Sequence, residues 1–237
     1  IPKINKVLKT AEVDIPTNCP SCGYKLSWDS DFLMCFNHEE CPEQIVGKII
    51  YFFRILANND GFGQATIQKL YAAGIHQVSD IYLLSKEKLI SMGFGEKTSQ
   101  NLIDQLTRSR LESIEDWRFL AAFGVQRLGM GNCENLLKSY SIDQVFNLSV
   151  QDISNIDGFA ELTAELIFDG LLSIKAQYKT LVSGGFQLES TLLSSDTNSS
   201  SNLFNNKKIV FTGAMNESRV ELQKQAKGYG AIISKNV

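Results

Sequence analysis

The chain has 237 residues, of which 43% are hydrophobic and 21% charged, and its formal net charge is −3. This length suits one large domain or two or three small ones. No run approaches the roughly 18 apolar residues of a membrane span, and no signal-peptide pattern opens the chain. The slight acidity argues against a strongly basic duplex-binding surface, whose footprint is clustered Lys and Arg. It permits nucleic-acid binding through backbone amides and a few positioned lysines.

Residues 1–18 are expected to form an extended, alternating lead-in with little core of its own. The chain starts Ile1-Pro2-Lys3-Ile4, without a methionine and with the character of a strand. We therefore expect the sequence to be a fragment of a longer protein.

Four of the five cysteines follow within 23 residues, in the pattern Cys19-x2-Cys22-x12-Cys35-x5-Cys41. Residues 19–43 are too few to bury a core and need a cross-link such as a bound metal or a disulfide. Four soft ligands on two knuckles predict a tetrahedral zinc site. Protein fills all four ligand positions, which leaves none for a reactive water, so this zinc is expected to be structural. Free thiols or a disulfide pair are the alternatives, and His38 is an alternative ligand.

Residues 44–186 are expected to form a helical body in which one short turn recurs four times. The four turns are Asp60-Gly61-Phe62-Gly63, Met92-Gly93-Phe94-Gly95, Gln126-Arg127-Leu128-Gly129 and Asp157-Gly158-Phe159-Ala160. The residues before the hydrophobic one in each turn are 32, 34 and 31 residues apart, and a period of this length indicates one supersecondary unit. These matching residues are Gly61, Gly93, Arg127 and Gly158. A helix over Gln44–Leu56, apolar along a wide stripe, is expected to pack on these repeats.

Each turn combines a hydrophobic residue, which should plug into the core, with small flanking residues that expose backbone amides at a helix N-terminus. Such a terminus is a natural seat for a phosphate. Contacts of this kind fix position on a nucleic acid without reading its sequence. The residues expected to contact DNA are Gly61, Gly63, Gly93, Gly95, Lys97, Arg127, Gly129 and Gly158. The alternative is a helical array whose glycines only make tight turns.

The four turns are not equivalent. The second is the most complete, because Gly93-Phe94-Gly95 is followed by Glu96-Lys97, which adds a cation. The third has Arg127 in place of the first glycine, which adds a phosphate contact or strains the turn. The fourth has Ala160 and no neighbouring Lys or Arg, so its role is expected to be mostly structural.

Helix caps agree with this repeat pattern. Ser85 is expected to cap a helix, Ser141 with Gln144 and Ser149 with Asp152 are candidate capping boxes, and Gly74 is a candidate C-terminal residue. After the body, residues 187–206 are rich in Ser and Asn and are expected to be a flexible linker. From Lys207, a strand at 208–213, a helix at 218–229 and a strand from 231 are expected, so 207–237 opens a β-α-β unit.

Two enzymatic interpretations are rejected. Gly95-Glu96-Lys97-Thr98 resembles the end of a P-loop, but the spacing G-x4-G-K-[ST] is absent. The two histidines, His38 and His76, lie in the cysteine cluster and in a loop, so no nucleophile–base pair emerges. Cys133 lies at a small-residue position inside a helix, where a packed thiol is expected.

These features together resemble the C-terminal half of bacterial NAD-dependent DNA ligase, over nearly the whole chain. Ile1-Pro2-Lys3-Ile4 resembles the end of the family's OB-fold domain, and the four cysteines resemble its zinc finger. The turns at 60–63 and 93–97 resemble its tandem helix-hairpin-helix domain. Lys208–Gly213 with Ser218-Arg219 resembles the start of its BRCT domain. The fold class expected is therefore a mainly α, multidomain fragment. It has four helix-hairpin-helix repeats over 44–186, after a zinc finger at 19–43 and before a partial α/β BRCT domain at 207–237.

The resemblance implies that this region grips nicked duplex DNA, independently of sequence, for nick sealing in replication and repair. The family's adenylated lysine lies in a K-x-D-G motif, which this sequence lacks. NAD and magnesium are therefore expected only in the missing catalytic half, and the chain alone is expected to be inactive. A cytoplasmic, nucleoid-bound monomer is expected. The alternatives are a catalytically empty, ligase-like scaffold and a pure protein-interaction array.

Overall fold

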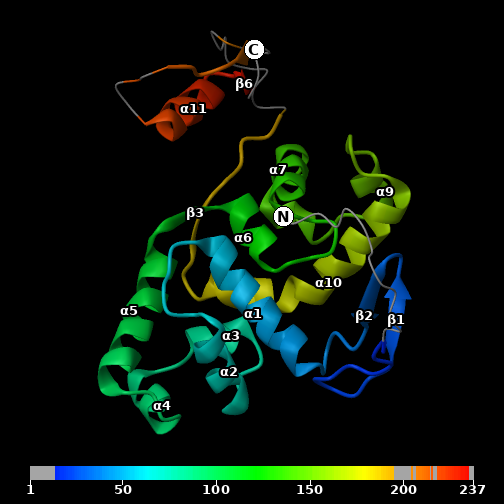
Figure 1. Ribbon diagram of the computed structural model, residues 1–237. Coiled ribbons are helices and arrows are strands. Elements are labelled where there is room, and N and C mark those ends of the chain that lie inside the picture. The colour runs from blue at the N-terminus through cyan, green and yellow to red at the C-terminus, as the bar shows by residue number, and fades with distance from the viewer. Residues whose placement is uncertain (1–13, 195–203, 205–206, 214, 216–217, 235–237) are drawn as a thin grey trace, which may run out of the picture. The chain divides into compact units, whose positions relative to one another are not determined.

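The structure, a computed structural model, describes residues 14–194, 204, 207–213, 215 and 218–234 (Figure 1). Most of the expected lead-in and much of the expected linker lie outside these residues. The chain divides into two compact units, one formed by residues 1–54 with 59–106 and the other by residues 55–58 with 107–237. Helices account for most of the described secondary structure, which confirms the expected mainly α class.

The first unit opens with a two-stranded antiparallel hairpin between cysteines. Strand β1 (Leu26–Asp29) pairs with β2 (Phe32–Cys35), and Leu26 lies opposite Cys35. The preceding chain adds an antiparallel bridge between Asn18 and Lys25. This pairing brings the first two cysteines close to the end of β2.

Helix α1 (Pro42–Leu56) begins directly after the last clustered cysteine. Proline suits the first helical position because its missing N–H has no partner there anyway. The carbonyl of Cys41 accepts the first helical bond from the amide of Ile45 at 3.0 Å. The helix therefore starts two residues earlier than expected, and its apolar stripe buries Val46, Ile49 and Phe52.

Helices α2 (Gln64–Ala72), α3 (Val78–Tyr82), α4 (Lys86–Ser91) and α5 (Glu96–Leu111) carry the first two turns. The predicted caps are confirmed here. Ser85 Oγ accepts a hydrogen bond from the amide of Lys88 at 3.2 Å. Gly74, which follows α2, has a φ of +88°, a left-handed conformation that glycine adopts without penalty.

The second unit packs around a long helix. Its elements are β3 (Ser113–Glu115), α6 (Asp116–Ala122), α7 (Met130–Ser139), α8 (Ile142–Val145), α9 (Val150–Ser154) and α10 (Glu161–Ser183). Tyr178 on α10 contacts Phe146 and Phe119, with ring centroids 4.6 and 5.5 Å apart. The capping box at Ser149 is confirmed in both directions, because Ser149 Oγ accepts from the amide of Asp152 and the Asp152 carboxylate accepts from the amide of Ser149.

The expected linker at 187–206 begins differently from the prediction. Residues Gln187–Glu189 form strand β4, which pairs in parallel with β3. The buried carboxylate of Asp116 then accepts hydrogen bonds from both the amide and the hydroxyl of Thr191. A carboxylate buried this deeply needs such partners, so the chain is ordered through at least Thr191.

A β-α-β unit closes the described chain. Strand β5 (Lys208–Ile209) pairs in parallel with β6 (Ile232–Ile233), and α11 (Arg219–Gly228) joins them. Ser218 caps α11 by accepting a hydrogen bond from the amide of Glu221 at 3.2 Å. The strands are shorter than the expected apolar runs.

Within the described residues, no helix has both the length and the apolar character that crossing a membrane requires.

Candidate nucleic-acid interface and metal cluster

The residue before the hydrophobic plug, numbered here as the first position of each turn, adopts a left-handed backbone conformation. The φ angles are +90° at Gly61, +85° at Gly93, +63° at Arg127 and +90° at Gly158. For a residue with a Cβ this conformation is unfavourable by about 1–2 kcal/mol. Three copies have glycine at this position, whereas Arg127 adopts the unfavourable conformation, so this position is left-handed in all four copies despite the sequence difference.

The second position is the predicted plug in every copy. The four side chains Phe62, Phe94, Leu128 and Phe159 are between 1% and 9% exposed. Phe62 stacks on Phe53 of α1, with ring centroids 4.1 Å apart and an interplanar angle of 12°. Burial of an aromatic or leucine side chain stabilises by about 1.5–3 kcal/mol, which anchors each turn to its own core.

The third position starts the next helix without capping it. The carbonyls of Gly63, Gly95, Gly129 and Ala160 accept the first bonds of α2, α5, α7 and α10 at 2.8–3.0 Å. Gly63, Gly129 and Ala160 have extended backbones and make no side-chain cap. Because the first N–H groups of a helix have no partner within the helix, these uncapped termini present amide donors.

The glycines at the third position are not required by the turn itself. A Cβ added to Gly63, Gly95 or Gly129 would meet no atom within 4 Å, and none of them has a left-handed φ. The fourth copy carries Ala160 in the same conformation. A side chain is therefore compatible with the fold here. A bare backbone at these sites suits the close approach of an external group.

The first two turns are tied to each other reciprocally. The side-chain oxygen of Gln105, on the helix after the second turn, accepts a hydrogen bond from the amide of Asp60 at the first turn at 3.0 Å. Conversely, Lys69 Nζ, on the helix after the first turn, donates to the carbonyl of Gly93 at 2.6 Å. Each turn is thus held by the other's helix, and the two turns form one structural pair.

The last two turns form a second pair in the second unit. The side-chain amide of Asn135, on the helix after the third turn, donates to the carbonyl of Asp157 at the fourth turn at 2.8 Å. In return, α10 packs tightly against the residues before the third turn, where a Cβ on Gly170 would lie 2.3 Å from Val125 Cγ1. The four predicted seats are therefore two pairs, one in each unit.

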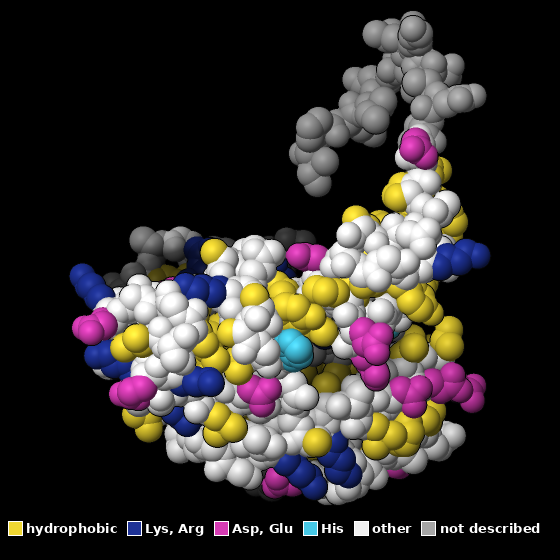
Figure 2. All heavy atoms as spheres, turned by 90° about the horizontal axis from the view of Figure 1, so that it is seen from below, with side chains coloured by type: hydrophobic (Ala, Val, Ile, Leu, Met, Phe, Trp, Pro, Cys, Tyr) yellow, Lys and Arg dark blue, Asp and Glu magenta, His cyan; other side chains and the backbone are white. Residues whose placement is uncertain are grey.

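Each unit has a hollow at one of its turns. An open cleft of about 560 Å³ lies beside the first turn, between Gly61, Thr66, Thr98 and Gln105. A second hollow, of about 590 Å³, is lined by the fourth turn itself. Lys97 and Arg127 are exposed, and Figure 2 shows basic side chains interspersed with acidic ones on the face drawn.

The repeat pattern gave no indication of Lys69, Gln105 and Asn135, which bond to the backbone of the turns. Each of them bonds to a turn that lies 22 to 45 residues away in the chain. No local pattern marks such residues. Asn132 differs, because it opens the helix after the third turn and donates to the carbonyl of Arg127, five residues away.

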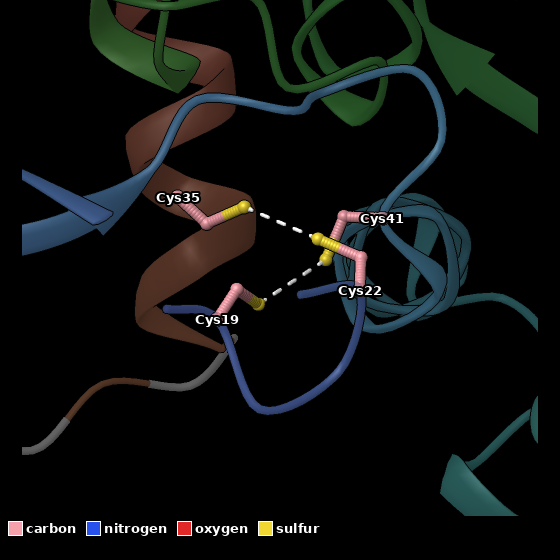
Figure 3. A group of neighbouring side chains, drawn as sticks. All are labelled: Cys19, Cys22, Cys35 and Cys41. Atoms are coloured by element: carbon pink, nitrogen blue, oxygen red, sulfur yellow. Dashed lines mark hydrogen bonds between the residues drawn. The ribbon is translucent and has the colours of Figure 1, made fainter. Parts of the chain in front are cut away.

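The four clustered cysteines meet at one point, as predicted (Figure 3). Their sulfur atoms all lie within 4.8 Å of one another, with 3.9 Å between Cys19 and Cys41 and 3.6 Å between Cys22 and Cys35. A disulfide requires about 2.0 Å. In a tetrahedral site with metal–sulfur bonds of about 2.3 Å, the sulfur atoms are about 3.8 Å apart. The spacing fits a four-thiolate metal site and does not fit disulfides.

The backbone favours the thiolate form at Cys19, whereas the Cys22 thiol keeps its proton more strongly. Amide hydrogen bonds from Cys22 and Ser21 lower the pKa of the Cys19 thiol to about 7. The pKa of Cys22 is raised to about 11 because burial and the neighbouring thiols outweigh the lowering effect of the Tyr24 amide. Crowded thiols resist losing several protons together, and a bound cation relieves this resistance. Gly23, with a φ of +74°, makes the knuckle turn possible.

His38 is not part of the cluster. Its Nδ1 atom lies 2.6 Å from the side-chain oxygen of Gln44 on α1. Gln44 also donates a hydrogen bond to the carbonyl of Cys35, so this pair braces the cluster from outside. All four positions around the cluster are sulfur, which is compatible with structural zinc.

Comparison with known proteins identifies related regions. Residues 53–108 match the SAM-like helix-hairpin-helix tandem family. The whole chain is 56% identical to DNA ligase of Ruthia magnifica subsp. Calyptogena magnifica and 47% identical to DNA ligase of Psychromonas ingrahamii, and covers 39% and 37% of those proteins. DNA ligase of Campylobacter fetus is 29% identical, again with the whole chain aligned and 37% of the relative covered.

The family match covers the first pair of turns, where the amide seats were predicted most clearly. The full-length matches extend the resemblance through the cysteine cluster and the second pair. The chain spans less than two fifths of the length of these relatives. The resemblance to DNA ligase is thus confirmed along the entire sequence, and the chain is a relative of one region of those proteins.

Proposed function

We propose that this chain is the DNA-holding, C-terminal region of a DNA ligase and grips nicked duplex through backbone phosphates. All four turns serve as helix-hairpin-helix motifs, two in each unit. Their uncapped helix N-termini donate amide hydrogen bonds to phosphate oxygens, which bind without reading sequence. The exposed cations Lys97 and Arg127 add charge at the second and third turns.

The third position of the turns carries this proposal. Glycine stands there in three copies although neither backbone strain nor packing requires it. A Cβ would instead project into open space, where it would keep a phosphate away from the amides. The fourth copy, with Ala160, has the weakest seat on the same argument.

Zinc in the four-cysteine cluster has a structural role in this proposal. When bound, it would hold Cys41, and with it the start of α1, against Cys35 at the end of β2 and against the turn that carries Cys19 and Cys22. Because α1 stacks through Phe53 on the plug of the first turn, the cluster supports the first pair of turns through α1.

The remaining assignments rest on the resemblance. We propose that 1–18 is the end of an OB-fold domain with its linker, that 19–43 is the zinc finger, and that 44–186 is the tandem helix-hairpin-helix domain. We propose further that 187–206 links this domain to 207–237, the start of a BRCT domain. The β-α-β order of β5, α11 and β6 supports the last assignment.

The catalytic step belongs to other parts of the parent protein in this proposal. The sequence has no K-x-D-G motif, so the NAD- and magnesium-dependent chemistry takes place outside this chain. A monomer associated with the nucleoid is the expected state. Sealing of a nicked duplex by the purified chain, supplied with NAD and magnesium, would contradict this part of the proposal.

Replacing Gly95 with valine tests the amide seats. Its Cβ enters open space, and the position does not have a left-handed φ, so the fold is retained. We expect at least about a tenfold loss of affinity for nicked duplex at low salt, because a hydrogen bond to a charged group contributes about 1.5 kcal/mol or more and about 1.4 kcal/mol is a factor of ten. Fluorescence anisotropy with a labelled duplex measures it.

Gly47→Val is the matched control, because Gly47 is exposed on α1 and its Cβ also meets nothing within 4 Å. Its affinity should equal that of the original chain. Equal affinities for all three proteins would refute phosphate seating at the second turn. Binding that does not change with salt would support a protein-interaction array instead.

A further inference from the structure

Lys69 belongs to the helix after the first turn but contacts the second. Its Nζ atom lies 2.6 Å from the carbonyl oxygen of Gly93 and 4.4 Å from the ring centroid of Phe94. Both contacts are with residues of the second turn, beside the uncapped start of α5. The side chain is exposed, and no carboxylate of a described residue lies within ion-pair distance of it.

This arrangement leaves donors free. An ammonium group carries three N–H donors, and the Gly93 carbonyl takes one of them. The face of Phe94 attracts the charge without consuming a donor. At least one N–H group can therefore reach a ligand at the surface of the second turn.

The contact also removes an obstacle to anion binding. The Gly93 carbonyl carries partial negative charge one residue before the plug, close to the amides that start α5. An unpaired carbonyl there would repel a phosphate. Lys69 covers this oxygen with a cation and so gives the turn a more positive surface.

In the third turn, one residue covers the equivalent carbonyl and another supplies the positive charge. The equivalent carbonyl, that of Arg127, accepts a hydrogen bond from the neutral side-chain amide of Asn132 at 2.7 Å. The cation there is Arg127 itself, which is exposed. Two turns that differ in sequence thus both combine a covered carbonyl with a positive charge.

We propose that Lys69 is a phosphate-binding residue of the second turn, supplied by the first repeat. The inference rests on the proposed DNA grip and identifies one of its contacts. It makes the second seat a composite, which is complete only while the first pair of turns is docked.

Charge-removing and charge-keeping variants of Lys69 test this inference in the full 237-residue chain. Lys69→Met keeps the apolar stem but removes the cation, and Lys69→Arg keeps the cation. The dependence of duplex affinity on salt is measured for each by anisotropy, from 50 mM upwards. Loss of one phosphate contact makes the slope of log K against log salt less negative by about 0.9 and reduces affinity at 50 mM by about tenfold.

We expect both effects for Lys69→Met, and a slope close to that of the original chain for Lys69→Arg. Lys179→Met is the matched control. Lys179 is an exposed lysine on α10, 18 positions after Glu161 and so about 27 Å along the helix from the fourth turn. Its affinity and slope should be unchanged.

A purely structural tie would give a different result. Affinity would fall in Lys69→Met with no change in slope, because no released counterion would be lost, and this would overturn the inference. Lys69→Gln repeats the comparison with a polar neutral side chain if Lys69→Met proves unstable in thermal unfolding. Failure of the original chain to bind at 50 mM salt would overturn the proposed function, whereas normal binding by both neutral variants would overturn only the role of Lys69.

Discussion

The two units build the same turn on different supports. In the first unit, glycine flanks the plug on both sides at each turn, and the residues that follow, such as Gln64 and Lys97, are polar. In the second, Arg127 and Ala160 replace two of those glycines. Exposed Met130 and Leu162 follow the third and fourth turns. The comparison shows that the turn needs a left-handed first residue and a buried second one, while the third is free to vary.

The supports differ as much as the turns. The N-terminal segment of the first unit exposes Tyr24, Trp28 and Phe32. Its four clustered thiols lie close together at one point. The second unit buries its aromatic side chains around α10, where Phe119 also contacts Phe186 at 4.7 Å. A metal is therefore expected to matter for the first unit and not for the second.

Loss of the metal is the largest expected difference between the units. Structural zinc contributes about 10–16 kcal/mol of apparent binding free energy, far more than so short a hairpin gains from burial. In Cys22→Ser we expect zinc to be lost and residues 19–41 to lose their order, while the second unit keeps its structure. Elemental analysis and amide NMR spectra measure both effects.

Cys133→Ala serves as the control cysteine. Cys133 is fully buried on α7, and its Sγ atom donates to the carbonyl of Leu128. Its removal should leave the zinc content unchanged. If the original chain holds no stoichiometric zinc, or if Cys22→Ser keeps an ordered hairpin, the two units do not differ in this way.

Packing against the third turn gives the next largest effect. Gly170→Ala would place a Cβ 2.3 Å from Val125 Cγ1. Overpacking of this kind destabilises by about 1–3 kcal/mol, so the second unit should unfold at a lower denaturant concentration. Gly131→Ala on α7, where a Cβ meets nothing within 4 Å, should be neutral or slightly stabilising. Equal midpoints for the two variants would show that α10 does not hold the third turn.

Strain at Arg127 gives a smaller effect, with opposite signs for stability and binding. Arg127→Gly should stabilise the chain by about 1 kcal/mol, because glycine adopts a φ of +63° without a Cβ clash. It should also weaken duplex binding, because the cation is lost. Thermal unfolding and anisotropy measure the two quantities.

Gly158→Ala makes the opposite change in the fourth turn, because it adds a Cβ at the left-handed position. Its φ is +90° and its Cβ would have only one neighbour, at 4.0 Å, so backbone strain alone should destabilise it by about 1 kcal/mol. Unchanged affinity in Arg127→Gly would show that the Arg127 side chain adds no phosphate contact at the third turn.

Local chemistry made much of this fold predictable. The plug residues, the Ser85 and Ser149 caps and the meeting of four cysteines follow from spacings of a few residues. Strand β4 did not follow, because Gln187-Leu188-Glu189 is too short to show a pattern, and its partner β3 lies 74 residues earlier. Asp116, at the start of α6, gave no sign that it would hold Thr191.

The candidate site was likewise only partly predictable from the sequence. The residues that present amides were visible in the repeat. The residues that hold the turns, such as Lys69 and Asn135, were not, because each acts on a turn from another repeat. The repeat in the sequence therefore predicted a row of four unequal seats, and the long-range contacts group them into two pairs.

Two hydrogen bonds, one from the amide of Asp60 to Gln105 and one from Lys69 to the carbonyl of Gly93, set the size of the smallest segment that could carry a proposed phosphate seat into another scaffold. A graft of the second turn alone, with α5, would leave behind the lysine that covers its carbonyl. A graft of the first turn alone would leave behind the glutamine that accepts from Asp60. Transplanting a working seat into another scaffold therefore requires both turns together, at least residues 59–106.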